Sequence, residues 1–196
     1  MIFPVFPLNG AILFPETNLP LNIFEDRYIQ MVDYALSNNR TIGMIQKKEN
    51  NNFFNIGCLG KITNFTETED GRYQINIKGI NRFIIKKIIK NNKKFITINA
   101  DILETKKEIK NKNVSNKKLL TGFDKYLKVK KIKFNISEFE SLDCFNLAKI
   151  ICVISPLDHL TKQMLLEFNS DKDLYKNLLS VLEIEMQNLE TSYKLN

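Results

Sequence analysis

The chain has 196 residues, 43% of them hydrophobic, which suffices for one domain or for two small lobes that share a core. No apolar run is long enough to span a bilayer and the first residues lack the basic start of a signal peptide, so we expect a cytoplasmic protein. Three cysteines without CxxC spacing and a single histidine argue against a disulfide framework, a zinc site and a multi-histidine metal centre.

The formal net charge of +7 comes mainly from lysine. The lysine tracts alternate with isoleucine and asparagine, as an AT-rich coding genome would produce, and we interpret them as solvated surface rather than as a nucleic-acid or membrane patch. Arginine is the more informative cation, because its planar fork serves a geometry that lysine cannot reproduce. The sequence contains four arginines, at positions 27, 40, 72 and 82.

The first hundred residues predict short strands joined by tight turns. Four of the five prolines fall within the first twenty residues, each beside a bulky apolar residue, which indicates short extended segments. Asp70 and Gly71 predict a hairpin turn, and residues 26–36 have helical spacing with an acidic start. We expect strands at residues 2–6, 19–23, 41–46, 54–66, 73–78, 82–85 and 95–102, with an interruption at Gly79. Together they predict a small, closed or nearly closed antiparallel barrel, with the helix at one end.

Beyond residue 103 the pattern changes to helical. We place a barrel lobe at residues 1–105, a polar, mobile linker at 106–117 and a helical lobe at 118–196. In that lobe, apolar residues line a first helix from about residue 119 to 127, and the capping box Ser137-x-x-Glu140 starts a second helix that Ser155 and Pro156 end. A third helix runs from about residue 159 to 167, and Ser170 caps a long last helix. These helices predict a compact bundle.

The combined motifs resemble the N-terminal, substrate-binding domain of the Lon protease family. The matching segments are FPL at 6–8, LFP at 13–15, LPL at 19–21, IFE at 23–25, RY at 27–28, GM at 43–44, GCLG at 57–60, DGRY at 70–73, Gly79, RF at 82–83 and KQMLLE at 162–167. The resemblance implies an α+β fold, a PUA-like antiparallel pseudo-β-barrel with one inserted helix, followed by a C-terminal helical bundle. The sequence has no G-x-x-x-x-G-K-[ST] loop, so it resembles the stand-alone form without ATPase or peptidase modules, similar to the domain in cereblon.

By resemblance, the function is non-enzymatic recognition of proteins or peptides, with an adaptor role in protein quality control. We expect unfolded or extended protein segments, or a partner protein, to bind in a groove between the lobes, with apolar side chains in pockets. No cofactor, metal or catalytic residue is predicted, and no membrane partner. The alternative is nucleic-acid (RNA) binding through the basic barrel, because PUA-like barrels include RNA-recognition modules.

Seven residues are candidates for a structural or recognition role. They are Pro20, Phe24, Glu25, Arg27, Tyr28, Arg72 and Arg82. For the charged ones we favour a structural role, in which one or more arginine forks pair with Glu25 and lock the helix to the barrel, over a recognition patch.

Cys58 lies between two glycines, which raises the alternative of a nucleophile. A cysteine nucleophile needs a base, and the only histidine, His159, falls in the other predicted lobe. We therefore expect Cys58 to be a packed strand residue and His159 to be a surface or capping residue.

Overall fold

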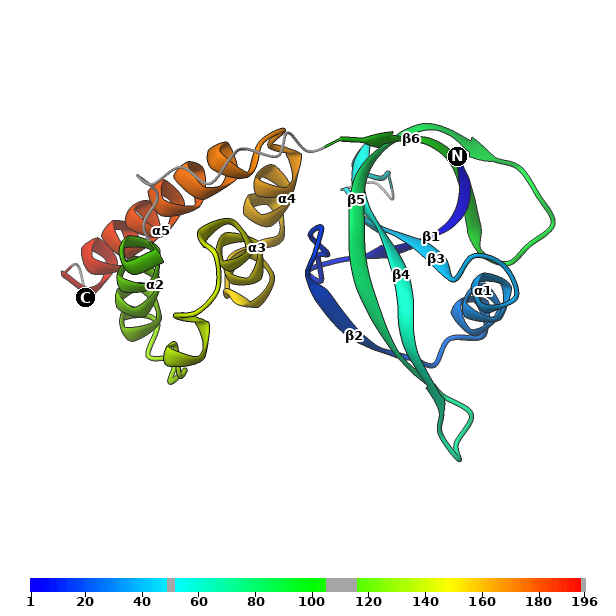
Figure 1. Cartoon of the computed structure of the whole chain (residues 1–196), viewed down its shortest axis with the longest axis horizontal. Coiled ribbons are helices and arrows are strands. Elements are labelled where there is room, and N and C mark those ends of the chain that lie inside the picture. Colours follow the sequence, from blue (N-terminus) through cyan, green and yellow to red (C-terminus); the bar gives the residue numbers. More distant parts are fainter. Residues whose placement is uncertain (49–51, 105–115, 195–196) are drawn as a thin grey trace. The chain divides into compact units, whose positions relative to one another are not determined.

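A computed structural model describes residues 1–48, 52–104 and 116–194. The chain forms two compact units: residues 1–105 with 156–167, and residues 106–155 with 168–196 (Figure 1). The predicted linker at 106–117 lies almost entirely outside the described residues, and its last two positions already belong to a helix.

The first unit is built on a mixed six-stranded sheet. Its strands are β1 (Ile2–Leu8), β2 (Asn18–Ile23), β3 (Thr41–Gln46), β4 (Ile56–Glu67), β5 (Tyr73–Ile89) and β6 (Ile96–Leu103), in the order β2-β5-β4-β3-β1-β6. β5 pairs with β6 as well as with β4, so the sheet curls back on itself as a pseudo-barrel rather than a regular closed barrel (Figure 1). All pairs are antiparallel except β1 with β3, which is parallel.

Gly79 lies inside one long strand, β5, instead of interrupting it as expected. A Cβ atom at this position would collide with the backbone carbonyl of Phe14. The Gly79 N–H donates to the Thr17 carbonyl at 2.8 Å, and the Gly79 carbonyl accepts the Glu16 N–H at 2.9 Å. The glycine is therefore where the turn after Phe14 docks onto the sheet, because only a residue without a side chain lets the two backbones approach so closely.

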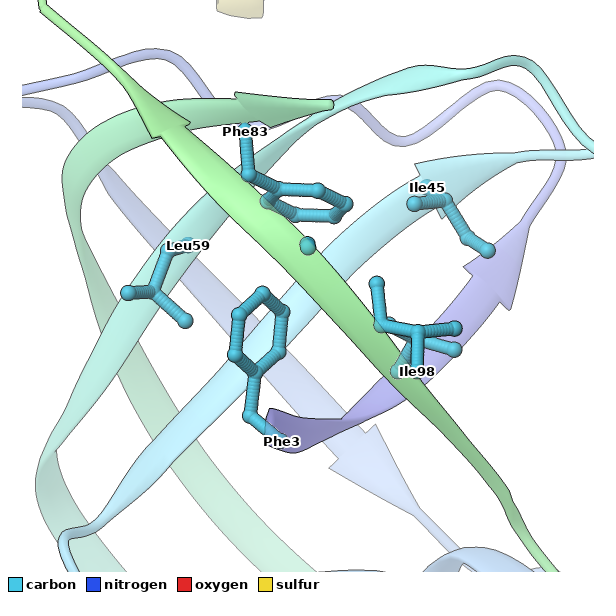
Figure 2. Close-up of a cluster of buried hydrophobic side chains, with 7 residues drawn as sticks. Phe3, Ile45, Leu59, Phe83 and Ile98 are labelled. Atoms are coloured by element: carbon cyan, nitrogen blue, oxygen red, sulfur yellow. The ribbon is translucent and has the colours of Figure 1, made fainter. Parts of the chain in front are cut away.

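The core of the first unit fills the pseudo-barrel. Figure 2 shows Phe3, Ile45, Leu59, Phe83 and Ile98 converging there from β1, β3, β4, β5 and β6. Val5 and Ala100 belong to the same buried cluster. The rings of Phe3 and Phe83 meet edge to face with centroids 5.1 Å apart, a favourable aromatic geometry. The inserted helix α1 (Asp26–Leu36) begins and ends where the sequence predicted, and it packs its buried face against β1 and β3.

Helix α4 (His159–Glu167) belongs to the first unit, although the sequence grouped it with the helical lobe. Asp158 caps its start, since one carboxylate oxygen accepts the N–H groups of Leu160 and Thr161 at 2.9 and 3.0 Å. Polar contacts tie it to the sheet: Gln46 Nε2 donates to the His159 carbonyl at 3.1 Å, and Gln163 Nε2 donates to the Ile56 carbonyl at 3.0 Å.

The second unit is helical, with α2 (Asn116–Val129), the single 3-10 turn η2 (Ser137–Phe139), α3 (Cys144–Ile154) and α5 (Asp171–Lys194). The predicted capping box at Ser137 is wrong: it gives only the η2 turn, and α3 begins at Cys144. Asp143 caps α3 by accepting the N–H groups of Phe145 and Asn146, both at 3.1 Å. The Ser170 cap is confirmed, because its hydroxyl oxygen accepts the Asp173 N–H at 3.1 Å.

Candidate functional site

A hollow of about 190 Å³ opens beside the first turn of α1. We call it the α1-end pocket; it is lined by Pro7, Arg27, Tyr28, Lys47, Phe53, Lys94, Phe95 and Ile96. These residues come from four separate stretches of the first unit, so the pocket exists only in the folded chain.

Strand pairing brings the four stretches together. β1 lies between β3 and β6, with Val5 opposite Ile96 on one side and Pro7 opposite Ile45 on the other. Lys47 follows β3 directly and forms an isolated bridge with Phe53, which fixes that segment against the strand. Because α1 packs on β1 and β3, its first turn delivers Arg27 and Tyr28 to the same place.

The floor of the α1-end pocket is apolar. Pro7, Tyr28 and Phe95 are buried, and the rings of Tyr28 and Phe6 lie 4.3 Å apart. Burial raises the pKa of the Tyr28 phenol above its ordinary value; the Arg27 cation opposes the increase and the Glu25 carboxylate adds to it. The phenol is therefore neutral near pH 7, and the floor presents aromatic and aliphatic surface.

The rim of the pocket is cationic. Arg27, Lys47 and Lys94 line it. Among the described residues, Glu25 is the one carboxylate paired with a rim residue, and its Oε2 accepts from Arg27 Nε at 2.9 Å and from Nη2 at 2.6 Å. Three cations less one carboxylate leave a local surplus of two positive charges. An apolar floor inside a cationic rim complements an apolar group next to a carboxylate.

The structure brings together three of the seven predicted candidates, Glu25, Arg27 and Tyr28. An arginine does pair with Glu25, but both side chains are about half exposed and only two residues apart. The pair therefore stays within the start of the helix. The expectation that it locks α1 to the barrel is wrong. Phe24, directly before this pair, is largely exposed.

The other three candidates lie elsewhere. Pro20 lines a separate hollow with side chains from β4 and β5, and Arg72 pairs with Asp70 at 2.9 Å in the exposed β4–β5 hairpin. Arg82 is only 3% exposed, and its Nη1 donates to the carbonyl of Glu167 at 3.1 Å and to that of Leu166 at 3.4 Å. Arg82 thus holds the C-terminal end of α4 through Nη1, and the helix dipole favours a cation at that end.

Sequence reasoning missed the rest of the pocket. In the sequence, Pro7 is part of a motif without a site signal, and Lys94 lies in a lysine-asparagine tract that is typical of solvated surface. Lys47, Phe53 and Phe95 carry no local signal that connects them to α1. The register of β1 with its two neighbours is what assembles them, and it could be known only from the fold.

Cys58 and His159 do not form a catalytic pair among the described residues. The Cys58 side chain is fully buried, with Sγ donating to the Leu59 carbonyl at 3.6 Å, and His159 is exposed at the start of α4. Across residues 1–48, 52–104 and 116–188, no group of three His, Cys, Asp or Glu side chains is placed to hold a metal ion. None of the helices in the described part combines the length and the apolar character needed to cross a bilayer.

The mixed pseudo-barrel with its inserted helix and accompanying helical unit is the fold of a Lon N-terminal domain. The Lon N-terminal domain protein from Xanthomonas campestris superimposes with a TM-score of 0.69 at 17% identity, covering 92% of this chain and 98% of that one. The N-terminal domain of Mycobacterium avium complex Lon protease gives 0.65 at 18% identity, covering 93% and 98%.

Comparison of the sequence with known proteins identifies the same class, the Lon N-terminal domains. The chain belongs to the ATP-dependent protease La (LON) substrate-binding domain family, whose model matches residues 2–183. It is 26% identical to the Lon protease of Buchnera aphidicola subsp. Acyrthosiphon pisum (strain APS) and 23% identical to that of Escherichia coli (strain K12), in each case over 98% of this chain. It spans 26% of the length of both relatives, about a quarter.

Proposed function

We propose that this protein is a recognition module that binds segments of other proteins, and that the α1-end pocket is one of its contacts. The observation that carries the proposal is the pocket itself, a buried apolar floor with three cations around it. Membership of a substrate-binding domain family supports the same class of partner.

The volume of the pocket limits the size of the group that it can bind. A hollow of about 190 Å³ accommodates one apolar side chain and not a folded surface. An extended or unfolded segment presents such side chains together with flanking groups, and acidic neighbours would meet Arg27, Lys47 and Lys94. One filled pocket gives weak binding, because ordering the segment costs conformational entropy.

An adaptor role in protein quality control is the finer part of the proposal. Its support is that the relatives that match this chain over 98% of its length are Lon proteases. In this role the module holds an unfolded segment while a protease acts on it. Degradation assays that combine this protein, a Lon protease and an unfolded substrate test the idea, and an unchanged degradation rate at saturating module would contradict it.

Peptide binding tests the pocket directly. Labelled peptides with a central Phe or Leu flanked by Asp and Glu are titrated by fluorescence anisotropy, beside the same peptides flanked by Lys. We expect the acidic set to bind, and Lys47→Glu with Lys94→Glu to weaken it by about tenfold or more. The control pair, Lys87→Glu with Lys90→Glu, changes the net charge equally at exposed positions outside the pocket. Equal weakening by both pairs, or equal binding of the Lys-flanked set, would contradict the proposal.

RNA binding is the competing prediction, and the pocket gives it little support. Stacking of bases needs open ring faces. Tyr28 and Phe95 are buried against Phe6 and Tyr34, which leaves Phe53 as the partly exposed ring of the pocket lining. A labelled single-stranded RNA belongs in the same titration. RNA affinity that exceeds peptide affinity, falls steeply with salt and is lost with Lys47→Glu and Lys94→Glu would make the pocket a nucleic-acid site instead.

A further inference from the structure

The helical unit carries a groove of its own, which the proposed function does not use. Two adjoining hollows of about 480 and 520 Å³ lie along α2 and α5, and both are lined by Lys125, Glu183 and Met186. Leu179 contributes to the first and Val129 to the second. We call them together the α2–α5 groove. Because all of its lining residues belong to the helical unit, the groove is complete within that unit.

A glycine keeps the groove open. Gly122 lies in the middle of α2, where glycine lowers helix stability relative to alanine. A Cβ at this position would meet only one atom within 4 Å, Leu179 Cδ2 at 3.8 Å, which is an ordinary contact. Packing of α2 on α5 therefore does not require glycine here. The effect of the missing side chain is to leave space in the groove.

The rim of the groove is strongly basic along α2. Lys117, Lys118, Lys125 and Lys128 line the two hollows, against Glu183 on α5. Lys128 is held by Asp124 at 2.6 Å, whereas Lys117, Lys118 and Lys125 form no ion pair within the described residues. Three unpaired cations against one carboxylate leave a surplus of two positive charges along one wall.

The shape favours a helix as the occupant. From Lys117 to Val129 the groove follows twelve residue steps of α2, about 18 Å or just over three turns of helix. Both walls are helices, whose interior backbone groups bond within the helix, so the groove offers no strand edge with which an extended segment could pair. A third helix lying along the seam of two packed helices needs no such edge.

The positive charge of the groove favours an acidic helix as the occupant. An apolar stripe would enter the groove over Leu179, Val129 and the adaptable Met186, and acidic residues beside the stripe would face the lysines of α2. A second copy of this chain, at +7, is disfavoured by like charge. RNA is disfavoured because neither arginine nor an aromatic ring lines the groove. We propose that the α2–α5 groove docks an acidic amphipathic helix of a partner protein.

A designed peptide tests the docking. The probe is a labelled 18-residue helix with Leu at i, i+3, i+4 and i+7 spacing and Glu on both flanks, titrated into the full chain by fluorescence anisotropy. A scrambled peptide of equal composition and a peptide with Lys in place of Glu serve as reference probes. We expect binding of the acidic amphipathic probe alone.

Two variants locate the binding. Gly122→Met fills the hollow without removing a contact, and Lys118→Glu with Lys125→Glu reverses the rim. Each should raise the Kd by about tenfold or more, while Lys87→Glu with Lys90→Glu, an equal charge change in the other unit, should leave it within about twofold. Thermal unfolding of each variant verifies that it is folded.

Several results would overturn the proposal. These are an unchanged Kd in both groove variants, equal loss in the control pair, equal binding of the scrambled probe, and tighter binding of a single-stranded RNA that the same variants abolish. Lys47→Glu with Lys94→Glu should not affect this probe, so the α1-end pocket and the α2–α5 groove can fail independently.

Discussion

Replacing Arg82 by Met should destabilise the first unit markedly. Arg82 is 3% exposed, and its guanidinium connects β5 to the last carbonyls of α4, so the substitution removes the donor and leaves those carbonyls without it. Met keeps much of the apolar stem, which limits any loss of packing. The change therefore probes the polar anchor rather than the volume of the side chain.

The contacts set the magnitude. The bond to Glu167 at 3.1 Å is an ordinary hydrogen bond, and a bond from a charged donor contributes about 1.5–3 kcal/mol. The bond to Leu166, at 3.4 Å, is too long to count fully. A cation at a helix C-terminus adds about 0.3–1 kcal/mol. We expect Arg82→Met to cost about 2–4 kcal/mol of the free energy of unfolding, and Arg82→Lys to cost less, because it keeps the charge but loses the fork.

Urea denaturation followed by circular dichroism measures the loss as a lower midpoint at unchanged m-value. Hydrogen exchange should show the amides of α4 losing protection first. Arg72→Met is the matched control: Arg72 is exposed and pairs with Asp70 on the hairpin, so its removal should cost less than about 1 kcal/mol. If Arg82→Met and Arg72→Met cost the same, or if Arg82→Met is neutral in stability and weakens peptide binding, the anchor role is refuted.

Three further predictions concern the helices. The pKa of Asp158 is lowered, first by the Thr161 hydroxyl and then by the N–H groups at the start of α4, so its stabilising effect is present above the ordinary aspartate range and is lost as the pH falls through the lowered value. The stability advantage of the wild type over Asp158→Asn should therefore shrink between pH 7 and pH 3 in urea titrations, and an advantage that grows would contradict the cap. Asp171→Asn removes the negative charge from the part-buried ion pair of Asp171 with Lys149, at 3.1 and 3.2 Å, and should cost about 1.5–3 kcal/mol by the same titration, whereas a cost below about 0.5 kcal/mol would count against it. Gly122→Ala should raise the free energy of unfolding by about 1 kcal/mol, since the new Cβ fits; a loss would mean that α2 needs glycine.

Local chemistry accounts for the parts of the fold that could be predicted from the sequence. The boundaries of α1 follow from the helical spacing of its apolar residues and its acidic start, and the hairpin at Gly71, with φ of 76°, follows from its Asp-Gly dipeptide. The start of α3 could not be predicted in the same way. Ser137-x-x-Glu140 has the pattern of a capping box, but Asp143 provides the cap that the helix uses. Two competing caps lie six residues apart, and packing decides between them.

The sequence predicted only those residues of the candidate site that lie next to one another in the chain. Glu25, Arg27 and Tyr28 share one helix start, so the sequence itself places them together. Lys47 and Lys94 reach the same pocket through the pairing of β1 with β3 and β6, which joins residues about forty to ninety positions apart. Arg82 shows the converse. Its residue type indicated a buried structural role, but its contacts with α4 are to backbone carbonyls, which no side-chain pairing rule would identify.

Helix α4 also explains why the boundary between the two units cannot be located from the change between strand and helix periodicity in the sequence. The chain leaves the helical unit after Ser155, forms α4 with the pseudo-barrel, and returns to the helical unit at Phe168. The helical unit is thus discontinuous, and α5 follows α3 through a segment that Arg82, Gln46 and Gln163 bind to the sheet. Loosening that segment removes stability from the first unit and lengthens the free connection between α3 and α5, which costs the second unit entropy. The contacts of α4 therefore link the stability of the first unit to the length of the connection between α3 and α5.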